Sequence, residues 1–155
     1  MNITKKKEFL KKRLVDFQRE ISTLRKTLGD TENSYESKAT QFHLQFIDLL
    51  DTLENIENNS REKERESALD NYAAKLLKNI VSVKNKTLRI LKANHIEKIE
   101  FPDNKAVREY SVIVDTQPSD TQENETILEV LKAGYINKKN QKIVRKAELI
   151  TVLNR

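Results

Sequence analysis

Apolar residues near the start of the chain recur at alternating steps of four and three positions. The stripe from Leu10 onward consists of Leu10, Leu14, Phe17, Ile21, Leu24 and Leu28. This is the heptad spacing of a coiled-coil helix, and burying each such side chain contributes about 1.5–3 kcal/mol. The sequence offers no second stretch of matching length that could pack antiparallel on this one. We therefore predict a paired helix over residues 1–41, formed by two copies of the chain, with Leu10, Leu14, Phe17, Ile21 and Leu24 at the dimer interface.

A second helical region follows a polar stretch in which Tyr35 is the main apolar residue. Its first stripe consists of Phe42, Phe46, Leu49, Leu50, Leu53 and Ile56. Residues 58–66 contain no apolar side chain and open with turn-favouring Asn-Asn-Ser, so they predict a connection between two helices. Another stripe, from Leu69 to Leu91, predicts a second helix from about Ser67 to Ala93. Two such hairpins, each over residues 42–99, are expected to form a four-helix bundle in the dimer, with Phe46, Leu50 and Leu53 in the interface.

The pattern changes at Phe101-Pro102-Asp103-Asn104, because proline and asparagine disfavour a helix and short β-branched runs follow. Five runs are strand candidates: 112–114, 126–131, 135–136, 142–144 and 148–153. The cluster from Asn137 to Asn140 predicts a hairpin tip, with asparagine supplying a positive φ. The fold class is therefore α+β: a long dimeric coiled-coil helix, a bundle hairpin, and a small all-β domain over residues 100–155.

Composition supports long helices over one compact globule. Of the 155 residues, 37% are hydrophobic and 34% are charged, while Gly and Pro number only two each. The chain has no cysteine, which excludes disulfides and thiolate sites and suits a reducing compartment, so a cytoplasmic location is expected. No apolar run is long enough for a membrane helix, and we expect no membrane association.

The net charge of +5 comes from 29 basic and 24 acidic residues. Residues 1–30, 71–100 and 133–155 are net basic, whereas residues 31–70 and 101–132 are net acidic. Basic runs at Lys5–Lys7 and Lys11–Arg13 are compatible with nucleic acid or an anionic membrane surface. Such runs more often form the solvated flanks of a coiled coil, so nucleic acid is an unlikely partner.

Candidate catalytic chemistry is sparse. His43 and His95 have no companions at metal-ligand spacing, so no metal site is expected. Glu54 and Glu57 lie one helical turn apart, but acid–base work would need a pocket that shifts one pKa. No glycine-rich phosphate loop or nucleophile elbow is present. We therefore expect neither an enzyme nor a bound cofactor.

Several stretches, read in order, resemble the GrpE family of nucleotide exchange factors. They are Leu49–Glu57, with Asp51 where proline is usual, Ile96–Ile99, Pro118–Asp120, Thr126–Tyr135, which ends in a Gly-Tyr pair, and Lys142–Ala147. The resemblance covers roughly residues 42–153, and the order and spacing of the stretches carry it. The chain departs from the family at Asn79 and His95, which stand where glycine is common, and at Gln141, which replaces the glycine before Lys142.

The resemblance implies a homodimeric co-chaperone of protein folding and the stress response, which binds the ATPase domain of a DnaK-type chaperone and promotes ADP release. The implied contact residues are Glu54, Asn55 and Glu57 on the helix, with Gly134, Tyr135, Lys142 and Arg145 on the β-domain. Alternatively, the basic hairpin around Lys142 only protects a sheet edge from aggregation. A different class also remains open: a coiled-coil scaffold or nucleic-acid-associated protein that has a GrpE-like fold and has lost exchange.

Overall fold

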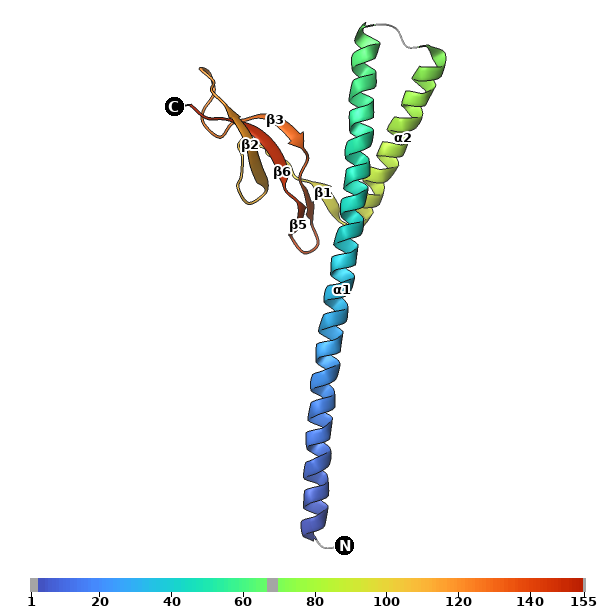
Figure 1. Cartoon of the computed structure of the whole chain (residues 1–155), viewed down its shortest axis with the longest axis vertical. Coiled ribbons are helices and arrows are strands. Elements are labelled where there is room, and N and C mark those ends of the chain that lie inside the picture. Colours follow the sequence, from blue (N-terminus) through green and yellow to red (C-terminus); the bar gives the residue numbers. More distant parts are fainter. Residues whose placement is uncertain (1–2, 67–69, 155) are drawn as a thin grey trace. The chain divides into compact units, whose positions relative to one another are not determined.

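The structure is a computed structural model that describes residues 3–66 and 70–154. Helices α1 (Ile3–Glu66) and α2 (Asn71–Ala93) precede the strands, which confirms the α+β class (Figure 1). The six strands are β1 (Ile96–Lys98), β2 (Ser111–Gln117), β3 (Ile127–Lys132), β4 (Tyr135–Asn137), β5 (Lys142–Arg145) and β6 (Ala147–Val152). Contacts divide the chain into an N-terminal unit, Met1–Gln41, and a C-terminal unit, Phe42–Arg155, which are described separately.

The N-terminal unit is helical from Ile3 onward, as its heptad pattern predicts. In the single chain the six stripe residues from Leu10 to Leu28 are between 50% and 62% exposed. Gly29 does not interrupt α1, and a Cβ built on it would meet no atom within 4 Å. This unit therefore presents its apolar stripe to the surroundings and buries none of it within the chain.

In the C-terminal unit, α1 continues through the segment that was predicted to connect the two helices. The prediction for residues 58–66 was wrong, because the Arg, Glu and Lys residues there favour a helix. An ion pair between Glu57 and Arg61, which are four residues apart in the sequence, further stabilises these helical turns. Helix α2 begins after Asp70, whose carboxylate accepts a hydrogen bond from the Ala73 amide at 2.7 Å. The expected start at Ser67, together with Leu69, lies outside the described residues.

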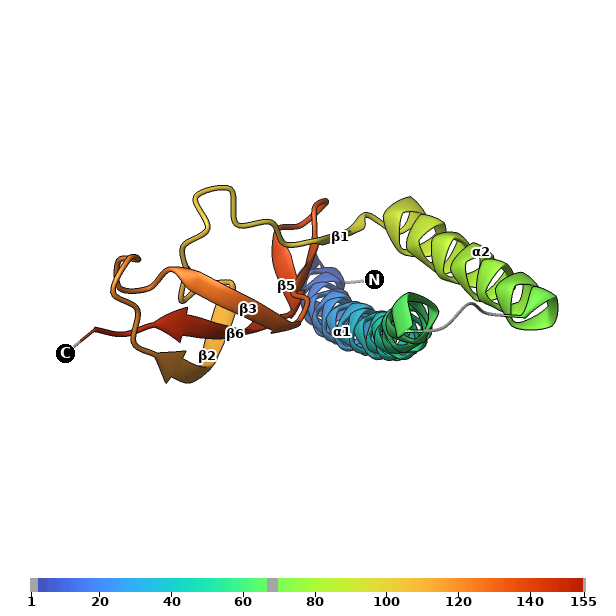
Figure 2. The same ribbon diagram turned by 90° about the horizontal axis from the view of Figure 1, so that it is seen from above.

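Helix α2 lies beside α1 near its own C-terminal end and diverges from it toward the connection (Figures 1 and 2). One core joins this end of the hairpin to the first strands. It consists of Ile47 and Leu50 of α1, Leu91 of α2, Ile96 of β1, and Ala133 and Tyr135, with Phe46 and Val144 packed against it. The apolar residues of four different elements, α1, α2, β1 and β4, are thus buried in one cluster.

The strands form two three-stranded sheets, ordered β1-β4-β5 and β2-β6-β3. The first is antiparallel, whereas β2 and β6 pair in parallel. All five predicted runs are strands, but the β-structure begins at Ile96, before the expected boundary at residue 100. Lys146 alone separates β5 from β6, so the chain passes directly from one sheet to the other. Ile127, Ala147 and Leu149 form a second, smaller core.

Four of the described residues other than glycine adopt a positive φ: His95, Asn104, Glu125 and Gln141. Gln141, at the β4–β5 hairpin, has a φ of 58°, and His95, after α2, has a φ of 61°. The expectation that Asn137 or Asn140 supplies the positive φ of the hairpin was wrong. Their side chains instead accept hydrogen bonds from backbone amides, Asn137 from Lys139 at 2.9 Å and Asn140 from Lys142 at 3.1 Å. His95 and Gln141 are the two turn positions at which the resemblance led us to expect glycine.

Candidate protein-binding surface

One face of α1 borders a groove in the C-terminal unit. Glu54 and Asn55 lie three and four residues after Asp51, and Asn58 lies four and three residues after them, so all four are on the same face of the helix. Together with Lys98 and residues 130–133 they line a groove of about 230 Å³. The helix thus supplies an acidic and amide wall, while Lys98 and Lys132 supply basic residues. Two of the predicted contact residues, Glu54 and Asn55, lie in this groove.

Arg145, at the end of β5, is directed at the chain's own helix. Its guanidinium donates hydrogen bonds from Nη1 and Nη2 to the two carboxylate oxygens of Asp51, at 2.6 and 2.9 Å. Burial would lower the pKa of Arg145, but the hydrogen bonds and charge of Asp51 outweigh it and raise the pKa. Asp51, which stands where the resemblance led us to expect proline, is thus the partner of this arginine.

Tyr135 lies in the core and is only 1% exposed. The guanidinium carbon of Arg145 is 5.6 Å from the centre of its ring. Burial raises the pKa of Tyr135 to about 12, and the nearby carboxylates of Glu54 and Asp51 add to the rise. Among the described residues, no group pairs with its buried hydroxyl. The Tyr135 ring therefore supports the candidate surface from within the core and is not itself exposed on it.

Gly134 is needed for close packing of backbone on backbone. A Cβ at this position would lie 2.7 Å from the Ala147 amide nitrogen and 2.9 Å from Cδ1 of Ile99. Its φ is not positive, so space is what requires glycine here, and conformational freedom is not. Gly134 accordingly determines how tightly the start of β4 packs against β6.

Glu57 joins the two helices of the hairpin. Its carboxylate accepts hydrogen bonds from Arg61, at 2.8 and 3.0 Å, and from Lys84 of α2. These hydrogen bonds, Lys84 first, lower the pKa of Glu57, and the residue is only 7% exposed. Sequence reasoning placed it beside Glu54 as a contact residue, but its carboxylate is engaged within the chain.

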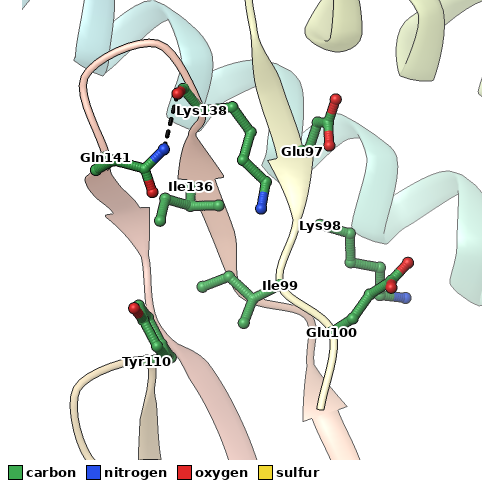
Figure 3. A pocket seen from close by; sticks show the side chains of 8 residues that line it. All are labelled: Glu97, Lys98, Ile99, Glu100, Tyr110, Ile136, Lys138 and Gln141. Atoms are coloured by element: carbon green, nitrogen blue, oxygen red, sulfur yellow. Dashed lines mark hydrogen bonds between the residues drawn. The ribbon is translucent and has the colours of Figure 1, made fainter. Parts of the chain in front are cut away.

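The β4–β5 hairpin presents basic side chains, because Lys138, Lys139 and Lys142 are exposed. A cavity of about 290 Å³ lies beside it (Figure 3). Figure 3 shows Ile99 and Ile136 among the side chains that line the cavity, and a hydrogen bond from the Gln141 amide to the Lys138 carbonyl, at 2.9 Å. Of the predicted contact residues in the β-domain, Lys142 is the most exposed.

Some of the apolar residues predicted for the dimer interface are not exposed on the surface of the single chain. Leu50 and Leu53 are 0% and 9% exposed, and Phe46 packs against the core. By contrast, Phe42, Leu49 and Ile56 are 56%, 46% and 40% exposed. These three residues are seven positions apart and continue the heptad position of Leu14, Ile21, Leu28 and Tyr35. This register could have been read from the sequence, but the wider stripe after residue 42 obscured it.

Two other features bear on possible chemistry. Within residues 3–66 and 70–154, no three His, Cys, Asp or Glu side chains gather as metal ligands would. In the same residues, no helix combines the length and apolar character needed to cross a bilayer. What the described surface presents is a set of charged and amide side chains on a hairpin and a helix face. The fold defines a class, helical-hairpin proteins that carry a small β-domain, and this surface is a candidate protein-binding site.

Comparison of the sequence with models of protein families identifies one family within this class. The GrpE family matches residues 1–152, and the chain belongs to the GrpE family. No curated protein matched the sequence. The family is one of non-enzymatic co-chaperones, and membership implies nucleotide exchange for DnaK and dimerisation.

Proposed function

We propose that this chain is the nucleotide exchange factor of a DnaK-type chaperone and acts in the cytoplasm. The observation that carries the proposal is the family match over residues 1–152, on a chain whose helical hairpin and β-domain share one core. The chaperone's ATPase domain would be bound by the β-domain and the adjoining face of α1. ADP would then leave the opened cleft, and the exchange factor itself would bind no nucleotide.

The mechanism is one of differential binding. A factor that binds the open ATPase domain more tightly than the closed one shifts the chaperone toward the open state. Its coupling to nucleotide is reciprocal, so bound nucleotide must weaken binding of the factor by the same ratio. No covalent step is required of the exchange factor.

The contact surface that we propose combines exposed and supporting residues. Lys142 on the hairpin, with Glu54 and Asn55 on α1, would touch the chaperone. The other predicted contact residues, Glu57, Gly134, Tyr135 and Arg145, are engaged within the chain and would hold this surface in shape. Their contribution would therefore be indirect.

We also propose that the active form is a homodimer. Its paired helix would extend over residues 1–41 and bury Leu10, Leu14, Phe17, Ile21 and Leu24. The hairpins of residues 42–99 would then meet through exposed Phe42, Leu49 and Ile56, because Leu50 and Leu53 are already buried within each chain. Residues 100–155 would remain outside this interface and engage the chaperone.

ADP release from a purified DnaK-type chaperone tests the proposal. Fluorescent ADP is preloaded on the chaperone, and its release is followed by stopped flow after addition of substoichiometric protein. We expect release to accelerate severalfold, and Lys142→Glu to reduce the acceleration about tenfold through loss of a contact worth about 1–2 kcal/mol. Lys86→Glu makes the same charge change on exposed α2 and should have little effect.

The same assay separates the alternatives. Unaltered ADP release with every chaperone of the source cell would refute exchange activity. If the chain then bound DNA or RNA with an affinity that falls steeply with salt, the scaffold or nucleic-acid reading would replace it.

A further inference from the structure

The hairpin and α1 are joined by a contact that links residues 94 positions apart. Arg145 and Asp51 meet through two parallel hydrogen bonds, at 2.6 and 2.9 Å. Their side chains are 16% and 24% exposed, so solvent screens the pair only in part. Two-pronged arginine–carboxylate pairing fixes direction as well as distance, which a single ion pair does not.

The same guanidinium also ties the start of β4 to this contact. The Ala133 carbonyl accepts hydrogen bonds from Nε at 3.1 Å and from Nη2 at 2.9 Å, and Asp48 lies 3.5 Å from Nη1. One face of the guanidinium lies near the Tyr135 ring. One side chain therefore connects β5, the β3–β4 link and α1.

Apolar packing alone would leave this junction less defined. Contacts of Leu50 and Tyr135 stabilise association of the helix and the sheet, but such contacts are not directional. A buried ion pair is weak evidence for stability, whereas its geometry can specify one arrangement among several. In this chain, the arrangement that the ion pair would specify is the direction of the exposed lysines of the hairpin relative to Glu54 and Asn55. These lysines are Lys138, Lys139 and Lys142.

We propose that the Arg145–Asp51 pair, here called the latch, is a positioning contact that holds the basic β4–β5 hairpin at a fixed angle to α1, so that hairpin and helix engage the chaperone together. Arg145 thus acts through Lys142 and touches no part of the chaperone. The part played in exchange rests on the proposed function, whereas the fixed angle does not.

The fixed angle can be measured without any chaperone. The chain has no cysteine, so Lys139→Cys and Asn59→Cys, both at exposed positions, allow two spin labels to be attached. Doubly labelled chain is diluted with excess unlabelled chain, and the distance distribution is recorded by pulsed electron resonance. We expect a narrow distribution that broadens in Arg145→Lys and in Asp51→Asn. If the width of the distance distribution is unchanged in both variants, the latch does not fix the angle between hairpin and helix, and the proposal is wrong.

The role in exchange is measured as the ratio of affinities for nucleotide-free and ADP-bound chaperone. Loss of positioning should lower this ratio about fivefold or more in Arg145→Lys and Asp51→Asn, because a mobile hairpin also accommodates the closed state. The double variant should lose no more than the worse single variant. A merely structural defect would instead weaken both affinities equally, and that result would contradict the positioning role.

Glu123→Gln serves as the matched control, because it removes the Lys105–Glu123 pair, whose side chains are 51% and 80% exposed. It should leave both the distance distribution and the affinity ratio unchanged. If the distance distribution broadens in Arg145→Lys and Asp51→Asn but the affinity ratio does not change, the proposed role of the pair in exchange is wrong. If the parent chain itself fails to release ADP, the proposed function fails, while the label distances still decide whether the latch exists.

Discussion

The two units of this chain use one helix, α1, in opposite ways. In Met1–Gln41 the apolar residues of the stripe are between 50% and 62% exposed, whereas in Phe42–Arg155 the helix buries Ile47 and Leu50 completely. Heptad spacing runs through both units. The N-terminal unit therefore leaves its apolar stripe exposed within the single chain, while the C-terminal unit has part of its core within the chain. The difference shows that periodicity identifies an apolar face without identifying what covers it.

The largest effect is expected from a charge within the N-terminal stripe. Ile21→Asp should destabilise the proposed dimer by about 3–6 kcal/mol, because two side chains, each contributing about 1.5–3 kcal/mol, are lost. Circular dichroism should show early loss of helix, while the unfolding of the C-terminal unit shifts little. Val15→Asp places the same charge outside the stripe and should cost far less. Equal effects of the two changes would contradict pairing through the stripe.

The two glycines give opposite predictions for the two units. Gly134→Ala should destabilise the C-terminal unit by about 1–3 kcal/mol, because its Cβ would lie 2.7 Å from a backbone nitrogen. Gly29→Ala should stabilise the helix of the N-terminal unit by about 0.5–1 kcal/mol, since nothing obstructs its Cβ. Chemical denaturation of each variant measures both values. The comparison fails if the two changes have the same sign.

Acid should weaken the C-terminal unit through Glu57. The folded-state pKa of Glu57 lies below its ordinary value of 4.5, so the ionised carboxylate stabilises the fold above that pH. The contribution is lost as pH falls through the lowered pKa. Glu57→Gln should therefore cost about 1–2 kcal/mol at pH 7 and progressively less below pH 4.5.

Denaturation midpoints across this pH range measure the effect of Glu57. Glu62→Gln, an exposed change on the same helix, provides the control. A constant difference between Glu57→Gln and the parent chain at all pH values would contradict the role of the ionised carboxylate.

The smallest effects are expected at His95 and Gln141, two of the residues with a positive φ. His95→Gly should stabilise the C-terminal unit by up to about 1 kcal/mol, because glycine accepts a positive φ without strain. Gln141→Gly should stabilise it less, because this change also removes the side-chain hydrogen bond to the Lys138 carbonyl. Asn79→Gly, within α2, should instead destabilise by a few tenths of a kcal/mol, roughly. Thermal melts of the three variants test the signs. Destabilisation by His95→Gly would contradict relief of strain at that turn.

Local patterns were sufficient to predict most of the elements. All five β-branched runs are strands, since alternation and turn residues act over a few positions. Strand β1 was not predicted as a strand, because three residues carry no periodicity and only pairing with β4 makes them one. The parallel pairing of β2 with β6 could not be predicted from the sequence either, because it joins segments that are far apart in the sequence.

Predictions for the candidate surface were more mixed, and Arg145 illustrates why. A basic residue in a basic hairpin was expected to face a partner, yet its carboxylate partner Asp51 belongs to a helix 94 positions earlier. Sequence spacing cannot reveal such a pair. Lys142, by contrast, lies on the exposed part of the hairpin, as its predicted role requires.

The sequence by itself determined where most of the helices and strands lie and that α1 carries an apolar stripe in heptad register. Only the tertiary structure decided which side chains of the widened stripe face inward. Leu49 is 46% exposed and its neighbour Leu50 is 0% exposed, although both are leucines on the same helix turn. The physical reason is that burial depends on contact with α2, β1 and β4, and local periodicity contains no information about where those elements pack.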